Sequence, residues 1–256
     1  MQGICQLGVI PMRSQPSHRS EMVSQLLFGE LFSVLEEKND WVHILAEWDN
    51  YNGWIERKQA EILDEQEYDS LLNKKRHFVT GLLAEVKSDD NKAFMIPFGS
   101  TLFNLSGNTF SIGKKQFSFS GQANEITTPS PQQVTDLALR FLHAPYLWGG
   151  RTVLGLDCSG FTQVVYKAFG LKTPRDSSEQ ALSGTPVNLI SEAQEGDLAF
   201  FENGEGVITH TGILLSDGKI IHSSGMVRTD QIDHHGIFDL SARKYRHKLR
   251  TISRIL

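Results

Sequence analysis

The stretch LDCSGFTQVVYKAFG (residues 156–170) predicts a helix that begins at a cysteine. Its apolar residues recur at the spacing of one helix face, as Phe161, Val164, Val165, Ala168 and Phe169. Asp157 is a residue type that favours the position before a helix, and Gly170 favours the position after one. The thiol of Cys158 is therefore expected in the first turn of this helix.

The regions on either side of this helix predict an α+β domain. Apolar residues within residues 132–142 also recur on one helix face. Three strand-like runs follow the cysteine helix, at residues 197–201, 210–215 and 219–222. Helices that precede an antiparallel sheet are typical of the α+β class.

Length and composition are those of an ordinary globular protein. The chain has 256 residues, enough for one large domain or two to three small ones. Hydrophobic residues make up 39% and charged residues 21%, which excludes a collagen-like or wholly disordered chain. The formal net charge of -5 does not indicate nucleic-acid binding, and no run of about 18 apolar residues predicts a membrane span. No nucleic-acid or membrane partner is therefore expected.

The N-terminus does not have the pattern of a signal peptide. No basic residue precedes Arg13, and the apolar run at residues 4–10 contains Gln6 and Gly8 before it stops at Pro11. A cytoplasmic location is expected on this basis.

The first half of the chain predicts short strands separated by turns. Four strand-like runs lie at residues 5–10, 31–35, 41–46 and 53–55. Their alternation and spacing predict a small antiparallel barrel, which is assigned to residues 1–62.

A second, more divergent barrel is predicted over residues 63–126. Strand signals return there after an acidic segment, residues 61–73, which predicts a short helix or connector. Residues 121–131 end in a stretch of Thr, Ser and Pro and predict a linker. The α+β domain is assigned to residues 127–256.

Cys158 occupies a position that favours a reactive thiol. Unpaired backbone N–H groups and the positive end of the helix dipole favour the thiolate, which is the nucleophilic form. The alternative is a buried, inert cysteine, but two histidines downstream favour the reactive one. Cys5 is expected to be structural, since two cysteines cannot form a disulfide framework.

His210 and His222 can cooperate in only one register of the hairpin between them. A two-residue turn would place the two histidines on opposite faces. A three-residue loop at residues 216–218, with Gly218 left-handed, would place His222 opposite Gly212. The histidines would then form a diagonal pair on one face, about 7 to 8 Å apart at the backbone. We predict the three-residue loop.

Cys158, His210 and His222 together suit nucleophilic acyl transfer. His210 would take the thiol proton and later give it to the leaving amine, while His222 would hold the His210 ring in the correct tautomer. The predicted reaction is amide hydrolysis through a thioester. One cysteine and two histidines also suit zinc, but no fourth ligand is apparent, and no metal or other cofactor is expected.

Six short motifs stand in the order found in the NlpC/p60 family of papain-like cysteine peptidases, and the chain resembles that family. They are YLWGG (146–150), LDCSGF (156–161), PRDS (174–177), GDL (196–198), HTGI (210–213) and IH (221–222). The resemblance implies a papain-like domain in which helices pack on an antiparallel sheet. It implies Cys158 as nucleophile, His210 as base and His222 as third member. The two preceding barrels resemble bacterial SH3-like (SH3b) domains.

The resemblance also implies the substrate. It would be a murein stem peptide, cut between γ-D-glutamate and the following diamino acid. Tyr146 matches a tyrosine beside the nucleophile that helps to stabilise the oxyanion. Trp148, Asp157 and Ser159 match residues that line the substrate cleft.

Asp176 departs from many wall hydrolases of the family, which have an uncharged residue at this position. A carboxylate here would pair with a free ammonium group, and Ser177 could add a hydrogen bond. This resembles the subgroup that requires a free N-terminal L-alanine, as in L-Ala-γ-D-Glu-diamino acid.

In that subgroup the first SH3b domain contributes an acidic residue and a tyrosine to the amine pocket. The resemblance nominates Glu21, in an expected loop at residues 19–25, and Tyr51. Glu30 is the alternative to Glu21.

These observations predict a monomeric, cytoplasmic cysteine peptidase of cell-wall peptide recycling. It would hydrolyse the γ-D-glutamyl-L-diamino acid bond of free murein peptides with an unblocked N-terminal L-Ala. Two alternatives stay open: an exported peptidoglycan hydrolase or amidase that acts on intact wall, and a non-catalytic protein that binds wall peptides. The basic C-terminal segment, residues 243–254, is expected to be a solvated end of the chain.

Overall fold

The computed structural model describes residues 1–240 and 242–256. The chain divides into two compact units. The first contains Met1–Thr127, Trp148–Val153 and Lys167–Lys172. The second contains Thr128–Leu147, Leu154–Tyr166 and Thr173–Leu256. The domain boundaries expected from the sequence stay predictions.

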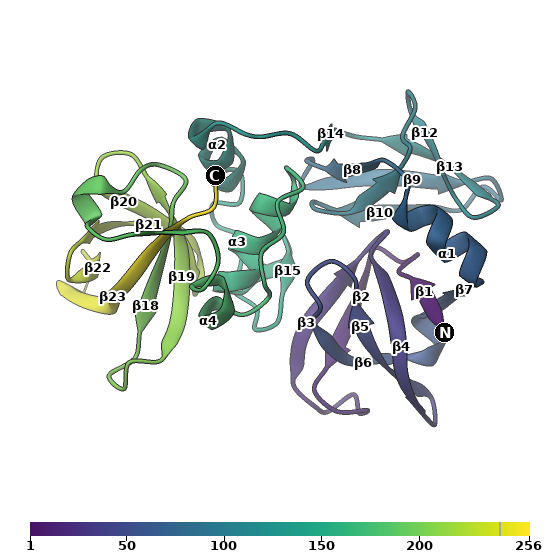
Figure 1. Cartoon of the computed structure of the whole chain (residues 1–256), viewed down its shortest axis with the longest axis horizontal. Coiled ribbons are helices and arrows are strands. Elements are labelled where there is room, and N and C mark those ends of the chain that lie inside the picture. Colours follow the sequence, from purple (N-terminus) through teal and green to yellow (C-terminus); the bar gives the residue numbers. More distant parts are fainter. Residues whose placement is uncertain (241) are drawn as a thin grey trace. The chain divides into compact units, whose positions relative to one another are not determined.

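The N-terminal part of the first unit is an antiparallel sheet that curls into a small barrel (Figure 1). Its strands follow the order β3-β2-β6-β5-β4-β1-β7. They are β1 (Gln2–Ile4), β2 (Val9–Arg13), β3 (Met22–Leu27), β4 (Leu31–Lys38), β5 (Trp41–Ala46), β6 (Asn52–Glu56) and β7 (Glu61–Leu63), with the 3-10 turn η1 (Arg57–Gln59) between the last two. Alternate residues of β5 are buried, as expected of a strand with one face on a core.

Two local expectations for this barrel are wrong. The expected strand at residues 5–10 is mostly a loop, because the main chain of Cys5 bonds to the turn before β4. The Cys5 N–H donates to the Glu30 carbonyl at 2.9 Å, and the Gly29 N–H donates to the Cys5 carbonyl at 2.8 Å. The expected loop at residues 19–25 contains the start of β3, whose buried polar residues hid the strand pattern.

The rest of the first unit contains a helix and two small sheets. Helix α1 (Glu65–Leu72) begins after Asp64, whose carboxylate accepts the Glu67 N–H at 2.8 Å. The sheets have the orders β10-β9-β13-β12 and β11-β8-β14. Their strands are β8 (Arg76–Val79), β9 (Leu83–Ser88), β10 (Ala93–Pro97), β11 (Thr101–Phe103), β12 (Thr109–Ile112), β13 (Lys115–Ser120) and β14 (Ala123–Glu125).

This region shares a hydrophobic core with part of the first barrel. Phe28 and Leu31 belong to the same buried cluster as Val86, Phe110 and Phe117. That the region is a second SH3-like barrel stays a prediction. The expected linker is partly wrong, because residues 123–125 near its start form the short strand β14, which pairs with β8.

The second unit combines helices with a seven-stranded antiparallel sheet (Figure 1). The helices are α2 (Pro131–Leu139), α3 (Cys158–Lys167), whose last residue belongs to the first unit, and α4 (Ser177–Gln180). The sheet has the order β17-β23-β18-β19-β20-β21-β22, and β22 also pairs with β23. Its strands are β17 (Thr185–Val187), β18 (Leu198–Glu202), β19 (Ile208–Leu215), β20 (Lys219–Ser224), β21 (Met226–Asp233), β22 (Gly236–Asp239) and β23 (Lys244–Arg254). Strands β18 to β23 therefore close into a ring. The remaining elements of this unit are β16 (Gly155–Leu156) and the 3-10 turn η2 (Ile190–Glu192), while β15 (Arg151–Thr152) belongs to the first unit.

The helix beginning at Cys158 and the three expected strand runs are confirmed, with ends that differ by one or two residues. The expectation for the C-terminal segment is wrong in one respect. Strand β23 pairs with β17, β18 and β22, so its backbone lies inside the sheet although most of its basic side chains stay exposed.

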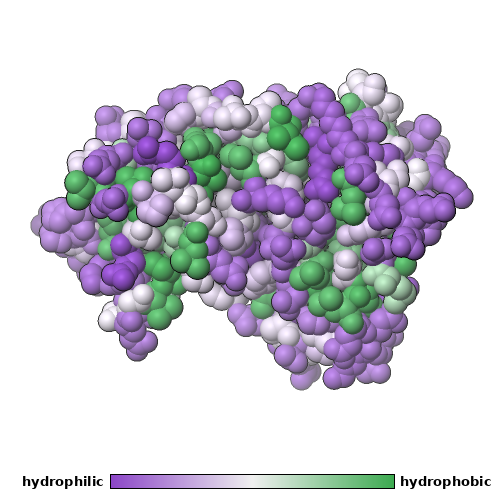
Figure 2. Space-filling model, viewed as in Figure 1, coloured by the Kyte–Doolittle hydropathy of each residue, from purple (hydrophilic) through white to green (hydrophobic). Residues whose placement is uncertain are grey.

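Among the described residues, no helix is both long and apolar enough to cross a bilayer. On the face drawn in Figure 2, hydrophilic residues surround several separate apolar patches.

Candidate active site

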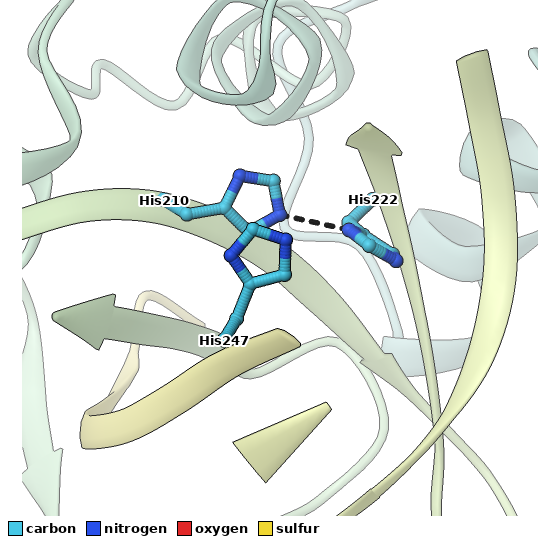
Figure 3. A group of neighbouring side chains, drawn as sticks. All are labelled: His210, His222 and His247. Carbon is cyan, nitrogen blue, oxygen red and sulfur yellow. Dashed lines mark hydrogen bonds between the residues drawn. The ribbon is translucent and has the colours of Figure 1, made fainter. Parts of the chain in front are cut away.

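The hairpin of β19 and β20 brings His210 and His222 together. Leu215 pairs with Lys219, and Gly218 has a φ of 66°. Both features confirm the three-residue loop. The Nε2 atom of His210 lies 2.8 Å from Nδ1 of His222, and the hydrogen bond between them is drawn in Figure 3. The shared face predicted for the two rings is therefore confirmed.

Gly212 makes room for this pair. It lies opposite His222 in the register of the hairpin, and a Cβ at residue 212 would lie only 2.8 Å from the Cβ of His222. Real Cβ atoms do not come so close to other carbons. The absence of a side chain at Gly212 is thus what allows the His222 ring to reach His210.

Strand β21 adds a carboxylate to the histidine pair, and this carboxylate was not predicted from the sequence. The Nε2 atom of His222 lies 2.9 Å from Oδ2 of Asp230. Arg228, also on β21, bonds to both carboxylate oxygens of Asp230 at 2.7 Å. The available signal was the alternation of Arg228 and Asp230 just after the His222 strand, which places both on one face of a further strand.

Strand β23 adds a third imidazole. The ring of His247 stacks on that of His210, with centroids 4.1 Å apart and an interplanar angle of 17° (Figure 3). The ligand nitrogens of His210, His222 and His247 lie within 4.8 Å of one another. The nitrogen lone pairs that bind a metal must converge on one point. The stacked rings of His210 and His247 direct their lone pairs in parallel. His210 and His222 share a hydrogen bond with each other. The arrangement therefore favours a hydrogen-bonded relay over a ligand set.

Cys158 is the first residue of α3 and is only 8% exposed. Burial, followed by the charge of Asp157, raises the pKa of the thiol to about 11, although the backbone N–H of Thr211 acts in the opposite direction. Burial, with the nearby rings of His222 and His247, lowers the pKa of His210 well below its usual value. Burial and the neighbouring carboxylate therefore act against the thiolate that the helix start favours.

Asp157 and Ser159 hold the start of α3 in place. One oxygen of Asp157 accepts the Gly160 N–H at 2.7 Å, which caps the helix. Arg175, itself 1% exposed, bonds to both Asp157 oxygens at 3.0 and 2.5 Å and to the Ser159 hydroxyl at 2.9 Å. The predicted substrate contacts of Asp157 and Ser159 stay predictions.

Tyr146 lies close to the nucleophile. Burial, followed by the charges of Cys158 and Asp157, raises the pKa of its hydroxyl to about 12, so it remains a hydrogen-bond donor at neutral pH. Its N–H donates to the Gly225 carbonyl at 3.0 Å, which fixes its main chain beside the hairpin of β20 and β21.

Asp176 and Ser177 follow Arg175 directly in the chain. Asp176 is the residue before α4, Ser177 is the first residue of that helix, and both are partly exposed. Their predicted contact with a substrate ammonium group stays a prediction.

The other predicted site residues lie in the first unit. The indole N–H of Trp148, which is 59% exposed, donates to Oε1 of Glu21 at 2.6 Å. Tyr51 is partly buried and packs against the core of the first barrel. Substrate contacts of these three residues stay predictions.

Glu30 is excluded as the alternative to Glu21. It is 3% exposed, and its carboxylate bonds to the guanidinium of Arg151 at 2.9 Å and to the ammonium of Lys167. Burial acts to raise its pKa, but the charges of Arg151 and Lys167 prevail and lower the pKa of Glu30 to about 2. A carboxylate buried against two cations has no place for a third.

A buried thiol at a helix start, in the same domain as a histidine pair fixed by an antiparallel sheet, is the arrangement of a cysteine peptidase. Comparison with known proteins agrees. Residues 143–244 match the NlpC/P60 family, and residues 12–59 match the bacterial dipeptidyl-peptidase SH3 domain. The chain belongs to the NlpC/P60 family and is a peptidase with an N-terminal SH3 domain.

Its relatives include two proteins named gamma-D-glutamyl-L-lysine dipeptidyl-peptidase. The one from Bacillus cereus is 30% identical over 84% of this chain and 71% of the relative. The one from Bacillus subtilis is 29% identical over 78% of this chain and 71% of the relative. The crystal structure of an NlpC/P60 family protein from Bacillus cereus has the same fold, with a TM-score of 0.87 and 22% identity over the whole of both chains.

Proposed function

We propose that this peptidase hydrolyses the γ-D-glutamyl-L-diamino acid bond of free murein peptides whose N-terminal L-alanine is unblocked. The observation that carries the proposal is the similarity, over most of the chain, to relatives named for the γ-D-glutamyl-L-lysine bond. The proposed setting is cell-wall peptide recycling in the cytoplasm.

The proposed reaction uses the buried pair of thiol and imidazole. As Cys158 Sγ attacks the scissile carbonyl carbon, its proton passes to His210, so the thiolate forms only during attack. The Tyr146 hydroxyl can donate to the oxygen of the tetrahedral intermediate. His210 then gives the proton to the departing amine of the diamino acid, leaving a thioester on Cys158. Water, deprotonated by His210, hydrolyses the thioester and restores the thiol.

Asp176 supports the proposed preference for a free amine. A carboxylate at this point would pair with the ammonium group of L-alanine, and the Ser177 hydroxyl would accept a further N–H. An N-acetylated peptide has no such charge and would lose this ion pair, which costs about 1 to 3 kcal/mol.

Mass spectrometry of three substrates tests the proposal. L-Ala-γ-D-Glu-L-Lys, its diaminopimelate counterpart and intact sacculi are incubated with the full chain, and Cys158→Ala serves as the blank. We expect the free tripeptides to yield L-Ala-γ-D-Glu and the diamino acid, with no fragments released from sacculi. Release of fragments from sacculi would favour an exported wall hydrolase, and binding of the tripeptide without turnover would favour a binding protein.

A further inference from the structure

We infer that Asp230 is a positioning residue that sets the proton arrangement of the catalytic histidine pair, through His222, so that Nδ1 of His210 is the basic nitrogen. The inference deepens the proposed function and rests on it, because it takes Cys158 as the nucleophile and His210 as its base.

The three side chains form one chain of contacts across neighbouring strands. His210 lies on β19, His222 on β20 and Asp230 on β21, and these strands are adjacent in the sheet. His222 lies directly opposite Arg228, so Asp230 is its diagonal neighbour on the same face. The contacts measure 2.8 Å between the two rings and 2.9 Å between His222 and the carboxylate.

The direction of these hydrogen bonds follows from what each group can donate. A carboxylate only accepts, so the Nε2 atom of His222 must carry the hydrogen that faces Asp230. The inference takes the His222 ring in its neutral form, which has one N–H, so Nδ1 of His222 is an acceptor. The facing Nε2 atom of His210 must then donate. The one ring nitrogen of His210 with a free lone pair is therefore Nδ1, which can take the thiol proton.

Arg228 keeps Asp230 in its charged, accepting form. It bonds to both carboxylate oxygens at 2.7 Å. Burial acts to raise the pKa of Asp230, but the hydrogen bonds from His222 and Arg228 prevail and lower it. When His210 becomes an imidazolium during the reaction, this carboxylate also stabilises the positive charge through His222.

The chain offers a closely matched control in Asp197. Its carboxylate bonds to Arg254 through two contacts of 2.8 Å. The side chains of Asp197 and Arg254 are 3% and 29% exposed, against 7% and 33% for Asp230 and Arg228. Asp197→Asn and Asp230→Asn therefore remove similar buried ion pairs, and only the second touches the histidines.

The first experiment measures thiol reactivity without a peptide substrate. Alkylation of Cys158 by iodoacetamide at pH 7 is followed by mass spectrometry of the digested chain. We expect Asp230→Asn to slow alkylation at least tenfold, because proton transfer to His210 is impaired, and Asp197→Asn to stay within twofold of the wild type. Equal rates in the wild type and Asp230→Asn would overturn the inference.

The second experiment reads the tautomers in the wild type and does not depend on a folded variant. Nitrogen-15 NMR of the histidine rings distinguishes Nδ1–H from Nε2–H. We expect His210 and His222 both to be Nε2–H tautomers. An Nδ1–H or doubly protonated His222 at rest would contradict the inference. Since neither experiment uses a peptide, failure of the proposed substrate would be seen separately, as absence of cleavage with normal tautomers and alkylation.

Discussion

Glu30 in the first unit and Asp230 in the second are both buried carboxylates, and they have different partners. In the first unit, Glu30 binds the cations of Arg151 and Lys167. In the second unit, Asp230 binds the cation of Arg228 on one side and the ring of His222 on the other. Arg151 and Lys167 are charged at neutral pH, so the Glu30 carboxylate can only stabilise them in place. The His222 imidazole can gain or lose a proton, so the Asp230 carboxylate can determine which ring nitrogen carries it.

The largest expected effect lies in the second network, which consists of Asp230, His222 and His210. His210→Ala removes the proposed base, and we expect kcat/KM for the free tripeptide to fall at least about 10⁴-fold. His234→Ala, which removes an exposed imidazole of the same unit, serves as the control and should leave the rate unchanged. More than a tenth of wild-type activity in His210→Ala would place the base elsewhere.

Disrupting the first network, Glu30 with Arg151 and Lys167, should lower the stability of the fold. Glu30→Gln leaves the buried charges of Arg151 and Lys167 without their counter-charge, and we expect the free energy of unfolding to fall by about 3 to 5 kcal/mol. Urea unfolding measures this. Glu61→Gln is the control, because its pair with Lys115 is about half exposed and contributes at most about 1 kcal/mol. Equal losses in the two variants would show that burial does not distinguish the pairs.

The second network should also depend on close geometry. In Gly212→Ala the new methyl group would meet the Cβ of His222 at 2.8 Å, so the ring must move away from His210. We expect a loss of about 100-fold in kcat, the effect of a displacement near 1 Å at a reacting group. Gly204→Ala places its methyl group in open space and should have wild-type kcat. A Gly212→Ala enzyme with wild-type kcat would mean that the His222 contact is dispensable.

Acid should weaken the first network in a defined pH range. The pKa of Glu30 is lowered from 4.5 to about 2, so below about pH 5 the unfolded chain binds a proton that the folded chain does not. Stability from this group is complete above that pH and is lost as the pH falls towards 2. At pH 3 the loss is about 2 kcal/mol. In urea unfolding at pH 3 and pH 7, Glu30→Gln should lose that much less than the wild type, and identical losses would contradict the assignment.

The smallest expected effect concerns a carboxylate outside both networks. Asp176→Asn removes the proposed partner of the substrate ammonium, and we expect KM for the free tripeptide to rise about 10- to 100-fold with little change in kcat. Asp217→Asn removes the same charge from the turn between β19 and β20 and is the control. An unchanged KM in Asp176→Asn would remove this residue from the proposed amine site.

The parts of the site that the sequence predicted are those set by local chemistry. Asp157 and Cys158 mark a helix start whose capping needs only neighbouring residues. The register of His210 and His222 follows from the length of one loop and the left-handed Gly218, so it could be worked out from consecutive residues.

The parts that the sequence did not predict depend on distant residues. Glu30 is excluded from the amine site by Arg151 and Lys167, which come more than 100 residues later in the chain. Asp230 joins the hydrogen-bonded chain and His247 stacks on His210, and both come from strands with a mixed polar pattern. The raised pKa of Cys158 results from its burial, which depends on the whole folded domain. It could not be deduced from the position of Cys158 at the start of a helix.

The most direct test of the proposed specificity is kcat/KM of the wild type for L-Ala-γ-D-Glu-L-Lys and for its N-acetylated form, measured by mass spectrometry of the released lysine. The account predicts cleavage of the free peptide and a value at least tenfold lower for the acetylated one, because the acetyl group removes the ammonium charge. Equal values for the two peptides would contradict it.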